Sequence, residues 1–220
     1  MKIQILNKTD TEIQFQVDGI NASMASALRR IMISEVPTMA IQFVEFKKSD
    51  SALYDEVVSN RLGQIPLTFN KDDYSLPEKC KCEGKGCSNC QVELILKKKG
   101  PATVYAEDLK SKDKTVRPVF EKIPIVELFE DQELEFIATA QLGVGKKHTR
   151  WQAAAVGYKN KTAKNVERKD KNESTEYMED SFIFNVESVC GLSSEDVVIQ
   201  ASEMLEEKVN EFKKNLGKLK

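Results

Sequence analysis

Two short segments near the start of the chain, residues 2–6 and 12–17, alternate between apolar and polar side chains. A period of two is typical of β-strands, because successive side chains of a strand point to opposite faces. The polar segment between them, residues 7–10, has the composition of a turn. The pattern therefore predicts an antiparallel β-hairpin.

The spacing then becomes helical over residues 21–34, where apolar side chains recur on one face. Asn21 or Ser23 is suited to cap the N-terminus of this helix, and Pro37 is expected to end it. Residues 159–178 carry many charges and few core-forming side chains, and predict a long flexible loop. Short strands are predicted at 40–46, 91–97, 102–105, 133–139 and 181–187.

The final segment predicts a long amphipathic helix that begins at Ser193 or Ser194. Acidic residues occupy its first turn and lysines gather at its end, as the helix dipole favours. Two interpretations of its apolar stripe stay open, namely core packing within the chain and contact with another chain, because the helix is long for a small sheet. The stripe comprises Val198, Ala201, Leu205, Val209, Phe212, Leu216 and Leu219.

Composition narrows the function classes. The chain of 220 residues has 33 basic and 35 acidic side chains, so overall charge does not favour nucleic acid or acidic membranes. A single histidine, His148, excludes sites with several imidazoles, and no phosphate-binding glycine motif or nucleophile elbow is present. No apolar run approaches the length of a membrane span. The sequence predicts a cytoplasmic protein without an active site of its own.

Four of the five cysteines lie within eleven residues, in a Cys-x-Cys and a Cys-x-x-Cys pair. Gly84 and Gly86 between the pairs allow the backbone to turn, so that four thiolates can surround one ion. We expect one structural zinc, with an iron–sulfur cluster and free thiols as alternatives. The fifth, Cys190, is expected to be a small buried side chain. The predicted ligands are Cys80, Cys82, Cys87 and Cys90.

Three motifs resemble those of the α-like subunits of multisubunit RNA polymerases. They are ALRRIMISEVP at 27–37, RLGQIPL at 61–67 and KKHTRWQAAA at 146–155. The cysteine loop is similar to the zinc loop of the archaeal D subunit and of the third-largest eukaryotic subunit, which the bacterial α subunit lacks. Size, and the lack of a C-terminal DNA-binding module in the sequence, favour the archaeal D branch.

The resemblance implies an α+β fold with two domains. A discontinuous α/β dimerisation domain (1–38 and 159–220) would carry an inserted, mainly β domain (39–158) with the metal loop at 80–90. The C-terminal stripe from Val198 to Leu216 would meet the small L subunit. The heterodimer would then recruit the largest and second-largest subunits and bind small polymerase subunits, with DNA bound only through the complex. Contacts with the large subunits would involve Arg29, Arg30 and Arg61.

The chain departs from the family pattern in three places. Asn60 replaces a histidine that often precedes the RLG motif, so a role for that imidazole does not transfer. Some archaeal relatives carry a cysteine-rich iron–sulfur domain in their second half, whereas this chain has only Cys190 there, so no cluster is expected. The gap between Cys82 and Cys87 differs by one residue from the eukaryotic loop.

The resemblance therefore implies a non-catalytic assembly subunit of DNA-directed RNA polymerase, with catalysis in the large subunits. The alternative is an independent zinc-containing nucleic-acid-binding protein, for which a basic patch with a stacking aromatic is required. Its one candidate consists of Lys146, Lys147, Arg150 and Trp151. We expect His148 and Trp151 instead to hold a loop by packing and hydrogen bonding. A self-contained enzyme is the weakest of the three interpretations.

Overall fold

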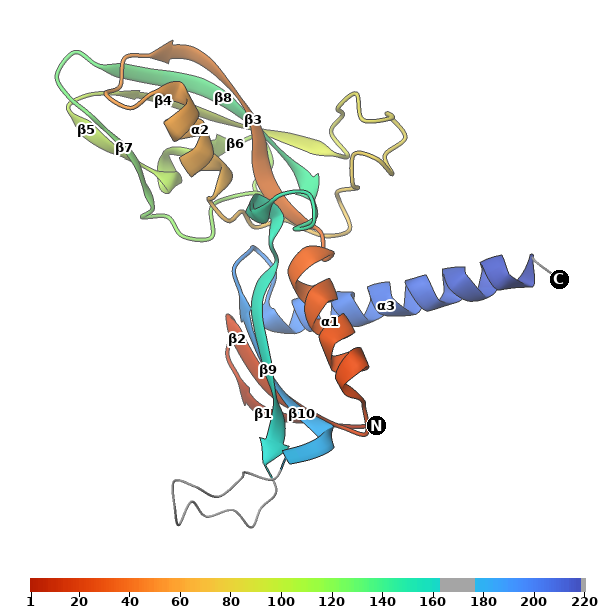
Figure 1. The fold of residues 1–220 in the computed structure, drawn as a ribbon. Coiled ribbons are helices and arrows are strands. Elements are labelled where there is room, and N and C mark those ends of the chain that lie inside the picture. Colours follow the sequence, from red (N-terminus) through yellow and green to blue (C-terminus); the bar gives the residue numbers. More distant parts are fainter. Residues whose placement is uncertain (163–176, 219–220) are drawn as a thin grey trace, which may run out of the picture. The chain divides into compact units, whose positions relative to one another are not determined.

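The computed structural model describes residues 1–162 and 177–218. The chain forms two compact units, each described by itself here (Figure 1). Unit 1 comprises residues 1–36, 153–189 and 193–220, and unit 2 comprises 37–152 and 190–192. Both contain strands and helices, and the α+β class expected from the sequence is confirmed.

The limits of these units differ from the domain limits expected from the sequence, which were 38/39 and 158/159. The second of these falls inside strand β9 (Ala154–Thr162). β9 pairs along its length with β10 (Tyr177–Ser188), so its hydrogen bonds assign all of it to unit 1. The Ala-rich start of β9 gave no signal for a strand.

Unit 1 contains an antiparallel sheet with the strand order β1-β2-β10-β9. β1 (Lys2–Lys8) and β2 (Glu12–Asp18) form the predicted hairpin. Over β2, β9 and β10 one sheet face is apolar and buried, and the rings of Phe15 and Phe184 stack on it with centroids 5.1 Å apart. The opposite face carries polar side chains, as expected for a sheet covered on one side only. β1 is exposed along its length, including Ile3 and Ile5.

Two helices pack against the apolar face of this sheet. α1 (Ala22–Ser34) is capped by Asn21, whose side chain accepts a hydrogen bond from the Met24 amide at 2.9 Å. α3 (Ser194–Gly217) is capped by Ser193, which accepts from the Asp196 amide at 3.1 Å. The helices contact each other and the sheet, and their buried side chains include Ile31, Met32, Val197 and Ala201.

Unit 2 is built on a second antiparallel sheet with the order β3-β8-β4-β6. Its strands are β3 (Thr38–Ser49), β8 (Glu133–Gly143), β4 (Gln91–Lys99) and β6 (Lys110–Ser111). A two-stranded sheet of β5 (Ala102–Tyr105) and β7 (Pro124–Leu128), the helix α2 (Asp55–Gly63) and the 3₁₀ turns Ala106–Asp108 and Thr149–Trp151 complete the unit. The core includes Leu62, Leu67, Leu94 and Phe136.

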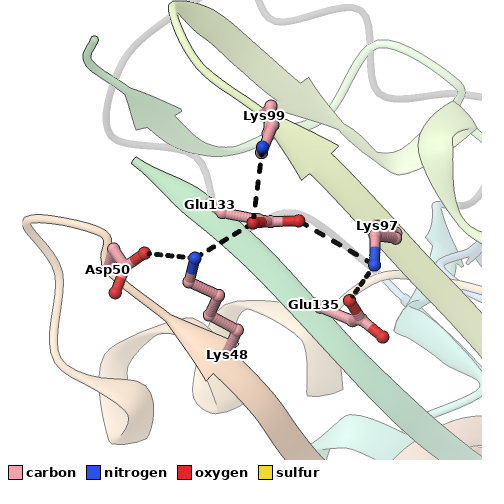
Figure 2. Close-up of polar contacts among 6 residues, drawn as sticks. All are labelled: Lys48, Asp50, Lys97, Lys99, Glu133 and Glu135. Atoms are coloured by element: carbon pink, nitrogen blue, oxygen red, sulfur yellow. Dashed lines mark hydrogen bonds and ion pairs between the residues drawn. The ribbon is translucent and has the colours of Figure 1, made fainter. Parts of the chain in front are cut away.

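A cluster of charged side chains joins the strands of this sheet at one end (Figure 2). Glu133 accepts a hydrogen bond from Lys48 at 3.0 Å and lies 3.9 Å from both Lys97 and Lys99. The hydrogen bond from Lys48 and the nearby lysines lower the pKa of Glu133 below its usual value. Because these lysines lie on β3 and β4 while Glu133 lies on β8, the carboxylate connects three strands.

The five predicted strands are present, within β3, β4, β5, β8 and β10. The helix α2 and the strands β6, β7 and β9 were not predicted. The prediction of a loop over 159–178 is wrong at both ends, because residues 159–162 continue β9 and residues 177–178 begin β10. Its remainder, 163–176, lies outside the described residues. No helix in the described part of the chain has the length and hydrophobicity to cross a membrane.

Candidate metal centre and partner surfaces

The four predicted metal ligands converge in unit 2. The sulfur atoms of Cys80, Cys82, Cys87 and Cys90 all lie within 4.8 Å of one another. The Cys80–Cys87 and Cys82–Cys90 sulfur pairs are 3.5 Å apart, and the Cys87–Cys90 pair is 3.8 Å apart. A tetrahedral zinc with bonds of about 2.3 Å requires sulfur separations of about 3.8 Å. The arrangement fits a tetrathiolate metal site.

The local sequence explains why the loop closes. Glu83, Gly84 and Gly86 have φ angles of 53°, 79° and 92°, in the left-handed region that favours glycine. These turns bring Cys80 and Cys82 back toward the second pair. The Cys90 amide donates to the Cys87 carbonyl at 3.0 Å, so the Cys-x-x-Cys pair forms a tight turn of its own. β4 begins at the next residue, which anchors this pair to the sheet.

The four thiols do not share one environment. Burial raises the pKa of the Cys90 thiol, whereas hydrogen bonding with Cys80 lowers that of Cys82. Cys90 is fully buried, and it must lose its proton to bind a metal. Metal binding to this loop therefore releases protons and weakens as the pH falls.

The metal loop is tied to the rest of unit 2 by an ion pair between Glu78 and Lys147. Lys147 belongs to the KKHTRW motif, which the sequence indicated as a family motif and as a possible basic patch. Charge alone could not reveal this pair, because its partners are 69 residues apart. Cys190, in contrast, is half-buried and lies outside the cluster, so the expectation of a buried side chain is wrong. It lies in the short 190–192 turn of unit 2, which leaves part of it accessible.

The residues of the HTRW segment hold the end of the unit 2 sheet. Arg150 donates from Nη1 to the Ile41 carbonyl at 2.9 Å, and the Trp151 Nε1 donates to the Gln141 carbonyl at 3.1 Å. His148 Nδ1 accepts from the Arg150 amide at 3.1 Å. The expected role of His148 and Trp151 in pinning this loop is confirmed. Trp151 is 5% exposed, so its ring cannot stack on a base without unfolding the segment.

The RLG motif forms the end of α2 and the turn after it. Leu62, Ile65 and Leu67 are buried in the core of unit 2. Arg61 is exposed, and one of its guanidinium nitrogens donates to the Ile125 carbonyl at 2.7 Å. A Cβ on Gly63 would lie 3.2 Å from Nη1 of Arg150, so a larger residue would crowd that guanidinium.

Arg29 and Arg30 on α1 differ in their contacts. Arg29 is half-buried, and its Nε donates to the Val156 carbonyl at 2.9 Å, which ties α1 to β9. Arg30 is exposed, and its guanidinium has no partner within the described residues. The structure therefore uses Arg29 inside unit 1 and leaves Arg30 free.

The predicted stripe on α3 divides into two parts. Ala201 is fully buried, and Val198 and Leu205 are half-buried. Val209, Phe212 and Leu216 are 45%, 65% and 48% exposed, on the part of α3 that continues beyond the sheet in Figure 1. Val197, which was not in the predicted stripe, is also buried, about one turn before Ala201 on the same face of α3. Leu219 lies outside the described residues.

Comparison with known sequences identifies the family. Residues 42–158 match the family described as the RNA polymerase Rpb3/RpoA insert domain. The chain is 44% identical over 163 residues to DNA-directed RNA polymerase subunit Rpo3 of Methanothermobacter thermautotrophicus, covering 72% of this chain and 61% of the relative. The chain belongs to the Rpb3/RpoA family.

Two further relatives with the name DNA-directed RNA polymerase subunit Rpo3 support this assignment. The protein of Methanosphaera stadtmanae is 40% identical over 186 residues, which cover 82% of this chain and 68% of the relative. That of Pyrococcus furiosus is 45% identical over 159 residues, which cover 72% and 59%. The alignments thus span about three fifths to two thirds of the relatives' length. The resemblance drawn from the motifs is confirmed at the level of the family.

Proposed function

We propose that this chain is a non-catalytic assembly subunit of an archaeal, cytoplasmic DNA-directed RNA polymerase, equivalent to the D subunit. The observation that carries the proposal is the uncovered stripe of Val209, Phe212 and Leu216 on α3 in a member of this family. Their spacing of three and four residues places the three side chains on one helix face. Apolar side chains gathered on one protruding helix favour contact with another chain.

The partner of this stripe is proposed to be the small L subunit. The first turns of α3 pack on α1 and the sheet, while the later turns reach beyond them. A helix of 24 residues is about 36 Å long, and only part of that length lies over the unit 1 sheet. A partner helix laid against the free part would bury the three side chains and complete a helical layer.

We propose that Arg30, in preference to Arg29 or Arg61, makes the contact that recruits the large subunits. Arg29 and Arg61 each donate to a carbonyl of their own unit, whereas Arg30 retains its full donor set. An arginine fork binds a carboxylate through two charge-assisted hydrogen bonds. We expect Arg30→Ala to leave the heterodimer with the L subunit intact and to weaken recruitment of the second-largest subunit, measured by size-exclusion chromatography of reconstituted subunits.

The matched control is Arg29→Ala. This substitution removes the hydrogen bond between α1 and β9, so it is expected to lower the stability of unit 1 by about 1–2 kcal/mol. If Arg30→Ala assembles like the unmodified protein, Arg30 has no role in recruitment.

The cysteine loop is proposed to hold one structural zinc. Four sulfur ligands leave no coordination position for water or substrate, so the metal would support the fold and not a reaction. The four thiolates would bind the ion, and the Glu78–Lys147 pair would hold the loop against unit 2. The alternative of an independent nucleic-acid-binding protein is not favoured, because its one aromatic candidate, Trp151, is buried.

Purification of the tagged chain from its native host tests the proposed function. Stoichiometric recovery with two large subunits and a small partner is expected. Recovery as a lone chain, at concentrations where the polymerase of the same cells remains intact, would contradict the proposal.

A further inference from the structure

The polar face of the unit 1 sheet, opposite to α1 and α3, contains an open groove of about 540 Å³. Two cross-strand rows form its floor. Gln14 lies opposite Asn185, which lies opposite Gly157 on β9. In the next row, Glu12 lies opposite Glu187, which lies opposite Ala155. We call these six residues the outer groove.

Neither the backbone conformation nor the packing of the described chain requires a glycine at position 157. A Cβ placed on Gly157 would meet nothing within 4 Å, and its φ is not in the left-handed region. A glycine inside a strand weakens the strand, and it often marks a place where another backbone or a ligand approaches closely. Since nothing in the described residues fills this space, the open floor at Gly157 is available to a second molecule.

The charges of the outer groove are also unbalanced. Glu12 and Glu187 are directly opposite each other on neighbouring strands, and neither carboxylate has a partner among the described residues. Like charges in this position destabilise a sheet. Lys8, at the end of β1, pairs with Glu195 instead. None of the described residues that line the groove is positively charged.

The remaining groups of the groove are amides. Nε2 of Gln14 donates to Oδ1 of Asn185 at 2.7 Å, which leaves other donors and acceptors of both amides for a neighbour. Amides next to two carboxylates and an empty glycine position match a polypeptide that carries a long basic side chain. Nucleic acid does not match, because its phosphates would meet the two glutamates.

We propose that the outer groove is a docking site for another polymerase subunit, which places a Lys or Arg side chain over Gly157 between Glu12 and Glu187. The inference rests on the proposed function. The site lies on the sheet face opposite to the helices, so it is separate from the α3 stripe. The assembled enzyme would then contact unit 1 on both faces of its sheet.

Carboxylate labelling tests this inference. The isolated heterodimer and the polymerase purified from the native host are treated with a water-soluble carbodiimide and glycine ethyl ester, and labelled glutamates are quantified by mass spectrometry. We expect Glu12 and Glu187 to be labelled in the heterodimer and protected in the polymerase. If both are labelled equally in the two samples, the inference is wrong although the proposed function stands.

Two other outcomes would also overturn the inference that the outer groove binds another subunit. If the chain does not enter the polymerase at all, the proposed function and this inference fail together. If the two glutamates become protected in the isolated chain as its concentration rises, the groove binds a second copy of the chain, which overturns the assignment to another subunit.

Two variants provide an independent test. Gly157→Leu fills the floor, and Glu12→Lys combined with Glu187→Lys reverses the charge. The charge reversal is expected to weaken incorporation into the polymerase by about 30-fold, the effect of losing a desolvated charge pair. Gly157→Leu is expected to weaken it because the leucine occupies the space of the partner side chain. Both should retain the heterodimer with the L subunit, which reports that unit 1 is folded. Glu127→Lys, at an exposed position of β7, is the matched control and should assemble normally. Normal incorporation of both groove variants would overturn the inference.

Discussion

Units 1 and 2 differ in how far their apolar and charged side chains are held by contacts within the same unit. In unit 2 the apolar side chains of one sheet face are buried in the core, while Phe43 and Ile95 on its strands are 58% and 39% exposed. Glu133 is surrounded by lysines, and Arg150 and Trp151 bond to carbonyls of the same unit. In unit 1 the helices pack on β2, β9 and β10, while Ile3 and Ile5 on β1 and Val209 and Phe212 on α3 stay exposed. The core and the HTRW segment of unit 2 are held by contacts within that unit, whereas the last turns of α3 in unit 1 carry an apolar row that its own unit leaves exposed.

This difference predicts which substitutions affect the stability of the chain and which affect its assembly with partners. Substitutions in unit 2 are expected to act on folding, because their contacts lie within the unit. Substitutions on the free surfaces of unit 1 are expected to act on complexes and to leave the isolated chain unchanged.

The largest effect is expected from the metal loop. Cys90→Ser should abolish binding of the proposed zinc and destabilise the loop, since structural zinc contributes on the order of 10 kcal/mol in small zinc-binding peptides. Elemental analysis and limited proteolysis around residues 80–90 provide the measurement. Cys190→Ser is the control and should keep the metal, because Cys190 lies outside the cluster. Zinc-free protein after expression with zinc in the medium would contradict the assignment.

The same substitution in the two units should have different consequences. Phe136 is fully buried in unit 2, so Phe136→Ala is expected to lower the free energy of unfolding by about 3–5 kcal/mol. Phe212 is 65% exposed, so Phe212→Ala should change it by less than about 0.5 kcal/mol in the isolated chain. Urea denaturation monitored separately for each unit measures both values. A large loss of stability in Phe212→Ala would show that Phe212 already packs within the chain.

A smaller contrast is expected between two arginines. Arg150→Ala removes a charge-assisted hydrogen bond to Ile41, and its guanidinium also lies 5.6 Å from the centre of the Trp151 ring. The unfolding free energy of unit 2 should fall by about 1.5–3 kcal/mol. Arg30→Ala removes no contact of the described chain and should leave the unfolding free energy unchanged. Equal changes of the unfolding free energy in Arg150→Ala and Arg30→Ala would contradict the difference between the two units.

The parts of the fold that the sequence predicted share a local signal. Alternation identified the β1–β2 hairpin, and cysteine spacing identified the four cysteines that cluster, without any tertiary information. α2 was missed because its buried Val58 and Leu62 are separated by polar residues and its helical face is short. β9 was missed because its Gly, Asn and Lys residues disfavour strands, and β10 supplies the pairing.

The candidate partner surfaces were only partly predictable for a related reason. The α3 stripe follows from its periodicity, but the point where burial ends depends on the size of the sheet beneath it. The different contacts of Arg29 and Arg30 depend on Val156, which is 127 residues from Arg29. The outer groove needs the register of three strands, because Glu12 and Glu187 come from distant parts of the sequence.

The smallest predicted effect concerns pH and the Glu133 cluster in Figure 2. The folded pKa of Glu133 lies below its unfolded value of about 4.3. The stabilisation is therefore complete above the unfolded pKa and is lost as the pH falls through the folded pKa. Glu133→Gln should reduce the acid sensitivity of unit 2, measured as the shift in unfolding midpoint between about pH 5 and about pH 3. An identical acid dependence in Glu133→Gln would exclude a role for this carboxylate.

The most direct test of the assembly account is the affinity of this chain for the L subunit, measured by titration calorimetry with Phe212→Glu. A glutamate at this position would place an unpaired charge in the proposed interface, so we expect the affinity to fall by at least about 30-fold. Asn210→Glu, exposed on another face of α3, is the control and should bind like the unmodified chain. Unchanged binding by Phe212→Glu would contradict the account.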